Sequence, residues 1–226
     1  MNQFGKVAIA LRSSQYDPGF FTSWTGLVSG GCLPGDQILS PAVRLAHSIA
    51  ANFLLIQFLE SDCDSILFLD DDHTFAPDSL AILRETEGFD AVSALTVTRR
   101  ADFAPLVIRL KDDGRYVSVA NPSGVMAVDM VGLAFTLIKR SAIEAVIKAR
   151  GTREIFQFLN KVGEDGAFSQ DLQSVGAKLA VNCNVNIGHS AAVTLWWNIK
   201  DKKTEMRFSG FGVGKSITSA VELQEE

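Results

Sequence analysis

Short apolar runs alternate along the chain with segments in which apolar residues recur every three or four positions. Continuous apolar runs of strand length are typical of strands that are covered on both faces of a sheet. The run "SILFLDDD" predicts a central strand that ends in acidic residues. Strands are expected at residues 6–14, 64–70, 90–98, 127–140 (broken by Gly132) and 178–189.

The segments between these runs carry helix signals. Ser40 followed by Pro41 is a typical N-cap with a proline at the first helical position. Ser141 and Glu144 have the spacing of a capping box. Helices are therefore expected over residues 41–61, 77–88, 141–151 and 164–176.

Alternating strands and helices predict an α/β fold with a mostly parallel sheet flanked by helices. Residues 106–120 predict a small hairpin that turns near Asp113 and Gly114. We expect a single domain over residues 1–209. The polar, Gly-rich residues 210–226 are expected to form a partly flexible C-terminal tail.

Composition narrows the class of protein. The chain has 226 residues, of which 47% are hydrophobic and 21% charged, as in globular domains with a full core. Its net charge of -5 gives no general attraction for nucleic acids or anionic membranes. The N-terminus lacks signal-peptide features, and the longest apolar region, residues 49–60, is too short to span a bilayer. Together with three scattered cysteines, this predicts a cytoplasmic protein without an integral membrane segment.

Asp70, Asp71 and Asp72 follow the central apolar run directly. Carboxylates this close repel one another by roughly 1 kcal/mol per pair in water, and by several times more near a protein interior. The carboxyl ends of such strands are where α/β sheets bind ligands. Alternation along an extended chain would point Asp70 and Asp72 the same way and Asp71 the other. The cluster predicts a divalent cation; a solvated acidic turn that caps the next helix is the alternative.

Two features of the second half add to this picture. Glu164 and Asp165 begin a predicted helix, where the helix dipole favours carboxylates, and His189 ends the last predicted strand. Each feature alone is common in structural roles, but an acidic turn, an acidic pair and a strand-end histidine in this order are more informative. His47 and His73 are interpreted as surface or packing residues.

On these segments the chain resembles GT-A glycosyltransferases of the family 2 type, from about Lys6 to His189. "ILFLDDD" is similar to the family's DxD strand, and "VDMVGLAFTLIKRSAIEAV" to its mid-domain strand and helix. "GEDGAFSQDLQSVGAKLAVNCNVNIGH" is similar to its closing segment and is the most specific part of the likeness. The opening "VAIALRSSQYD" departs from the family's usual first strand, and Ala134 replaces a glycine that is common in the family.

The resemblance implies transfer of a sugar from a nucleotide-diphosphate donor to an acceptor hydroxyl. It implies a divalent cation held by Asp70, Asp72 and His189. The imidazole ligand favours Mn²⁺ over Mg²⁺. It also implies that Asp165 is the general base of an inverting reaction. Glu164 would orient the acceptor or cap the helix.

Other residues near the same end of the sheet are expected to contact the nucleotide sugar. Arg99 and Arg100 have the chemistry to pair with phosphate, with a solvated basic turn as the alternative. Trp196 is a candidate for stacking on a sugar ring, with core packing as the alternative. The remaining expected contacts are Ser13, Gln15, Asp17, Asp70 and Asp71.

Two other functions match parts of the pattern. A sugar-1-phosphate nucleotidyltransferase shares the architecture and the carboxylate-bound metal, but it usually carries a Gly-rich basic loop after the first strand. Here "LRSSQYDPGFF" has only Arg12 and one glycine. A non-catalytic domain that binds a sugar or a protein partner is the second alternative. The sequence leaves open whether the acceptor is a glycan, a lipid, a protein or a modified nucleobase, and it leaves the oligomeric state open.

Overall fold

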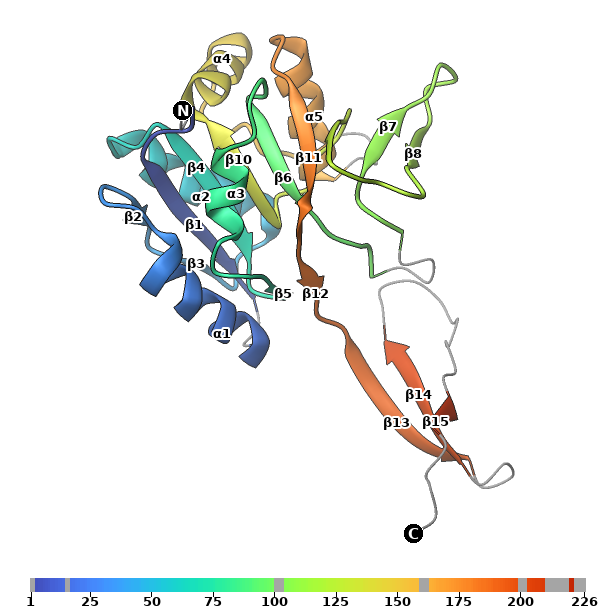
Figure 1. Cartoon of the computed structure of the whole chain (residues 1–226). Coiled ribbons are helices and arrows are strands. Elements are labelled where there is room, and N and C mark those ends of the chain that lie inside the picture. Colours follow the sequence, from blue (N-terminus) through green and yellow to red (C-terminus); the bar gives the residue numbers. More distant parts are fainter. Residues whose placement is uncertain are drawn as a thin grey trace.

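Figure 1 shows the computed structural model of the chain, which describes residues 3–14, 17–99, 104–158, 163–198, 203–209 and 220–221. From residue 192 onward, only the course of the backbone is described. The centre of the fold is an eight-stranded sheet in the order β2-β1-β4-β10-β6-β11-β9, with β3 also paired to β1. These strands are β1 (Val7–Ser13), β2 (Gln37–Ile38), β3 (Ala42–Val43), β4 (Ser65–Asp70), β6 (Ala91–Leu95), β9 (Val125–Ala127), β10 (Phe135–Lys139) and β11 (Leu179–Asn186).

The predicted α/β fold with a mostly parallel sheet is confirmed. Strands β2, β3 and β4 run parallel to β1, and β11 runs parallel to β6. Strand β10 lies antiparallel between β4 and β6, so the strands on its two sides point the same way, and β9 pairs antiparallel with β11. The carboxyl ends of β1, β4 and β6 therefore meet at one edge of the sheet.

Helices cover both faces of the sheet (Figure 1). Ile66 and Phe68 of β4 belong to the core on one face, and Leu67 and Leu69 to the core on the other. This alternation within one apolar run is what a strand buried on both faces requires. The first face is covered by α2 (His47–Glu60), α4 (Arg140–Arg150) and α5 (Glu164–Ser174), and the second by α1 (Pro18–Gly26), the π-helical turn η1 (Leu27–Gly31) and α3 (Ser79–Arg84).

Smaller sheets complete the described structure. The predicted hairpin is confirmed as β7 (Ile108–Leu110) and β8 (Tyr116–Ser118), with Gly114 at a φ of 79° in the turn. Strand β5 (His73–Thr74) pairs antiparallel with β12 (Gly188–His189). A third sheet, in the order β13-β14-β15, extends beyond β12 and away from the central sheet (Figure 1). Its strands are β13 (Ala192–Asn198), β14 (Lys203–Ser209) and β15 (Ala220–Val221). The rest of the expected tail lies outside the described residues.

The helix expected from Pro41 begins six residues later, at His47. Ala42 and Val43 instead pair with the end of β1 as strand β3. The predicted N-cap Ser40 is held in this extended segment by Gln57, whose side chain bonds the Ser40 backbone N–H and C=O at 2.9 and 3.0 Å. The correction has a physical reason: backbone pairing with β1 satisfies this segment better than one more helical turn.

The expected capping box of α4 is also wrong in detail. The helix begins at Arg140 with Lys139 as its N-cap, and no side chain caps it. Oε1 of Glu144 lies 3.7 Å from Nη1 of Arg140, four residues earlier in the same helix. The Glu144 side chain therefore does not bond the backbone N–H groups at the helix N-terminus. Among the described helices, none combines the length and apolar character needed to cross a membrane.

A buried ion pair fixes α3 against the start of the sheet, and its removal is expected to destabilise the protein. Asp36 accepts backbone N–H bonds from Val7 at 2.9 Å and from Leu33 at 2.7 Å, and it pairs with the buried Arg84. Asp36→Ala leaves the Arg84 charge buried without its partner, so we expect a loss of about 3–5 kcal/mol in unfolding free energy, measured with urea. Asp62→Ala, which breaks an exposed pair with Lys6, is the control and should change little. Similar losses for the two variants would contradict the assignment.

Candidate functional site

A pocket opens at the edge where β1 and β4 end. The three consecutive aspartates at the end of β4 contribute to its lining, together with the residues at the end of β1. The loop before β10 and the start of α5 approach from the other side. The charged and polar residues that line it are Arg12, Ser13, Ser14, His47, Asp70, Asp71, Asp72, His73, Arg99, Asp165 and His189.

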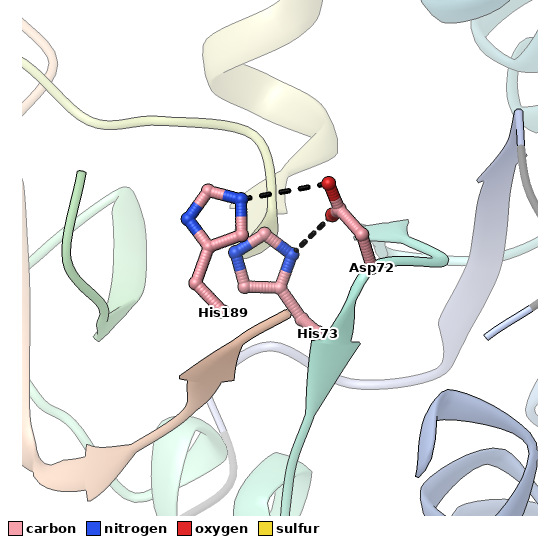
Figure 2. Close-up of side chains that lie close together, drawn as sticks. All are labelled: Asp72, His73 and His189. Atoms are coloured by element: carbon pink, nitrogen blue, oxygen red, sulfur yellow. Dashed lines mark ion pairs between the residues drawn. The ribbon is translucent and has the colours of Figure 1, made fainter. Parts of the chain in front are cut away.

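Asp72 faces two stacked imidazoles (Figure 2). Its Oδ1 lies 2.8 Å from Nδ1 of His73, and its Oδ2 lies 3.5 Å from Nε2 of His189. The two rings stack with centroids 4.1 Å apart, because β5 and β12 place His73 and His189 opposite each other. The candidate ligand atoms of these three residues all lie within 4.8 Å of one another.

The hydrogen bond on the far side of His189 orients its ring. Nδ1 lies 2.8 Å from the backbone oxygen of Val97, so this nitrogen carries the proton and donates it. Nε2 then faces the Asp72 carboxylate. A bond of this kind to a backbone carbonyl is the usual support of a metal-binding histidine.

Arg99 supplies a positive charge at the same carboxylate, with Nη1 3.0 Å from Oδ2 of Asp72. Burial works to raise the pKa of Asp72. The bonds from His189 and His73, together with the charge of Arg99, outweigh it and hold that pKa well below its usual range. Asp72 is therefore ionised at neutral pH and attracts cations.

Asp70 turns away from this cluster and pairs with Arg12 on the neighbouring strand. The two residues are paired in register, and the guanidinium makes bonds of 2.7 and 2.9 Å to the two carboxylate oxygens. Nη1 of the same guanidinium lies 3.5 Å from Glu164, the first residue of α5. Burial works against the charge of Arg12, but the carboxylates around it, Asp70 first, outweigh burial and raise its pKa.

Asp71 has a third set of partners. It accepts bonds of 2.8 Å from the Ser13 hydroxyl and from the Ser14 backbone N–H. The strand ends at Asp70, so the alternation expected for an extended chain does not continue through the triplet. The three neighbouring carboxylates coexist because each contacts different donors: Arg12, the two serines, or the two histidines with Arg99.

Asp165 lies in the first turn of α5 and lines the same pocket. Its Oδ2 accepts a bond of 3.3 Å from the Leu133 backbone N–H, whereas its buried Oδ1 has no hydrogen-bond partner among the described residues. Burial raises the pKa of Asp165 to about 6; the charge of Arg12 works against this rise, and the neighbouring carboxylates add to it. A carboxyl group with such a pKa can accept and release a proton near neutral pH.

The other expected site residues are less closely connected to the pocket. Asp17 caps α1 by accepting a 2.9 Å bond from the Phe20 backbone N–H. Gln15 and Arg100 lie outside the described residues, as does the side chain of Trp196. Nucleotide contacts by these residues stay predictions.

The sequence does not predict Arg12, Ser14, His47 or His73 as site residues. His73, interpreted from the sequence as a surface or packing residue, is buried beside Asp72. The only sequence signal was its position directly after the aspartates, because its pairing with His189 spans more than one hundred residues. Arg12 had no distinguishing pattern. His47 is largely exposed but lines the pocket, 3.8 Å from Glu164.

Comparisons with known proteins show what kind of fold carries this pocket. No protein-family model matches the chain, and no curated protein matches it. Among solved structures, the chain is similar to A197 from STIV, with 19% identity and a TM-score of 0.58, over 93% of this chain and 97% of A197. It is also similar to GalNAc-T7 solved with UDP, GalNAc and Mn²⁺, with 10% identity and a TM-score of 0.56, over 82% of this chain and 43% of GalNAc-T7. The fold is thus of the GT-A glycosyltransferase type.

The raised pKa of Asp165 predicts a pH-dependent stability. Because the folded protein holds this proton up to about pH 6 and the unfolded chain only to about 3.8, stability falls as pH rises between these values. Asp165→Asn removes the effect, so we expect the variant to be more stable at pH 7.5 by up to about 3 kcal/mol and equal to the parent below about pH 3. Urea unfolding across pH measures this. The exposed Asp112→Asn is the control, and parallel curves for parent and Asp165→Asn would contradict the buried position.

Proposed function

We propose that this protein is a metal-dependent glycosyltransferase that moves a sugar from a nucleotide diphosphate to an acceptor hydroxyl. One observation carries the proposal: a carboxylate and two imidazoles gather in the same pocket as a buried carboxyl group with a pKa near neutrality. The GT-A-type fold supports it. GalNAc-T7, which has this fold, was solved with a nucleotide, a sugar and Mn²⁺.

The residues present suit a divalent cation. Asp72, His73 and His189 offer one oxygen and two nitrogens, and Nε2 of the buried His73 has no hydrogen-bond partner among the described residues. Two imidazoles favour Mn²⁺ over Mg²⁺, which prefers oxygen ligands. A bound cation would supply the positive charge that offsets the charge developing on the leaving diphosphate. Asp70, paired with Arg12, is proposed to reach the donor rather than to be the principal ligand.

Asp165 is proposed as the general base. The acceptor oxygen forms a bond to the anomeric carbon while the bond from that carbon to the diphosphate oxygen breaks. The diphosphate keeps the electron pair, and the acceptor proton passes to the Asp165 carboxylate. Attack from the face opposite the leaving group inverts the anomeric centre. A pKa of about 6 leaves most of this carboxyl ionised at pH 7 and able to take the proton.

Three further residues are proposed to prepare the pocket for the donor. Arg99 is half-exposed at the pocket wall and has the reach to pair with a phosphate oxygen. Ser13 and Asp71, bonded to each other at the end of β1, are proposed to contact the nucleotide. Glu164 is held by Arg12 and is proposed to orient the acceptor rather than to take its proton.

The direct test is donor hydrolysis. The protein is incubated with a panel of nucleoside-diphosphate sugars, with and without Mn²⁺, and the released nucleoside diphosphate is measured by chromatography. We expect slow, Mn²⁺-dependent hydrolysis of one donor. Asp72→Asn should lose both hydrolysis and Mn²⁺ binding, whereas Asp165→Asn should keep donor binding and lose about 10²–10⁴-fold in transfer.

The exposed Asp112→Asn serves as the control here and should match the parent protein. Binding of no nucleoside diphosphate in the presence of Mn²⁺ would rule out the proposal and favour a non-catalytic GT-A domain. Metal-dependent release of diphosphate from a nucleoside triphosphate, with no hydrolysis of any sugar donor, would favour a nucleotidyltransferase.

Removing the charge of Arg99 is expected to change the affinity of the site for Mn²⁺. Its guanidinium binds the same Asp72 oxygen that faces His189, so it competes with a cation for that oxygen. Arg99→Gln should therefore bind Mn²⁺ roughly threefold more tightly in the absence of nucleotide, as for loss of a partly exposed ion pair. Electron paramagnetic resonance of free Mn²⁺ measures the affinity. Arg109→Gln is the matched control, because Arg109 forms an ion pair with Asp129 (Nε to Oδ2, 3.4 Å) and does not line the pocket. Weaker Mn²⁺ binding by Arg99→Gln would show that Arg99 supports the site instead.

A further inference from the structure

Helix α2 carries apolar side chains on both of its faces, although only one face packs on the sheet. Ile49, Phe53 and Ile56 have the i, i+4, i+7 spacing of one helix face and are 58%, 43% and 44% exposed. The helix contains no Lys, Arg or Asp, and its single Glu is its last residue. A helix that is apolar all round is normally covered on all sides. Its outer face therefore has the character of a binding surface.

An exposed apolar residue just before α2 lines the candidate site. Leu45, 42% exposed, lines the pocket together with His47 and Ala50, which begin the same helix. We call the exposed set the α2 apolar surface; it consists of Val43, Leu45, Ile49, Phe53 and Ile56.

Two polar side chains of α2, Asn52 and Gln57, are already engaged by the protein itself. Asn52 donates to the Phe156 carbonyl at 2.9 Å and accepts from its N–H at 3.1 Å. Gln57 makes the matching pair of bonds to the backbone of Ser40. A glycan or a peptide laid on this surface would leave its own polar groups without partners, at a cost for each one. A hydrocarbon chain has no such groups.

The dimensions also indicate a narrow apolar occupant. The helical part of the surface, from Ile49 to Ile56, is about 11 Å long at the usual rise per residue. Together, these half-exposed side chains present roughly 400 Å² of solvent-exposed surface. This is about half of the area that each partner buries in a stable protein–protein interface. A second copy of the chain would need much more area, whereas one hydrocarbon chain can lie along the stripe.

We infer that the acceptor is a lipid whose hydrocarbon chain lies along the α2 apolar surface, with its hydroxyl in the pocket beside Asp165. The inference rests on the proposed function and specifies its acceptor. The chain enters from the outer face of α2, and the donor enters from the ends of β1 and β4. The two substrates then meet at the start of α5, where Asp165 accepts the proton of the lipid hydroxyl as the sugar is transferred.

The test compares octyl and methyl β-D-glucoside, which share their hydroxyl groups and differ only in the chain, below the concentration at which micelles form. Titration calorimetry should show at least tenfold tighter binding of the octyl compound, because burying several methylene groups is strongly favourable. Phe53→Ser and Ile56→Ser should each reduce this preference about threefold or more. Phe21→Ser removes an aromatic that is 54% exposed on α1, on the other face of the sheet, and should keep the full preference.

Donor hydrolysis with Mn²⁺ separates failure of this inference from failure of the proposed function. Phe21→Ser should hydrolyse the donor at the parent rate, because Phe21 lies outside both the pocket and the α2 apolar surface. Hydrolysis together with equal binding of the two glucosides would overturn the lipid acceptor and leave the transferase intact. A parent protein that is dimeric by light scattering, with monomeric Phe53→Ser, would overturn it in favour of a contact between copies. Loss of hydrolysis in every protein would reject the proposed function itself.

Discussion

The ion pair between Arg12 and Asp70 is the contact on which the arrangement of the site depends. It joins the ends of two central strands, and the same guanidinium reaches Glu164 at the start of α5. Without this buried positive charge, several carboxylates from β4 and α5 would face one another at a poorly solvated edge, where repulsion is several times stronger than in water. Arg12 thus allows α5 to bring a second acidic pair to the strand that already ends in three aspartates.

The three aspartates of the triplet are compensated by different partners, and this gives them different properties. Asp70 is neutralised by a buried arginine, which cannot lose its proton, and Asp71 is held by the hydroxyl and backbone of the β1 end. Asp72 is paired instead with two imidazoles, which are possible metal ligands, and with a half-exposed arginine that a cation could displace. This difference in partners, more than the number of aspartates, makes Asp72 the residue best suited to receive a cation.

Features that depend on neighbouring residues can be predicted from the sequence, whereas features that depend on contacts between distant segments cannot. The central strand and its acidic end are encoded locally in residues 65–72, and the hairpin at Gly114 follows from local turn chemistry, so both could be read from the chain. The helix expected at Pro41 was wrong because pairing with β1, a contact between distant segments, outweighed a local capping signal. His73 was missed for the same reason: its meaning comes from the register of β5 with β12. The resemblance drew attention to Asp72 and His189, but it gave no sign that Asp70 would pair with Arg12.

The fold by itself does not select a substrate, because similarity at 10–19% identity reflects architecture only. Selection has to come from the walls of the pocket, and these differ in character. The wall formed by the ends of β1 and β4 is densely charged and hydrogen-bonded, which suits a phosphorylated donor. The wall formed by the start of α2 combines the apolar Leu45 and Ala50 with His47. In the proposed transfer, the charged wall would hold the donor by its diphosphate, and the less charged wall at α2 would admit an acceptor that carries little charge.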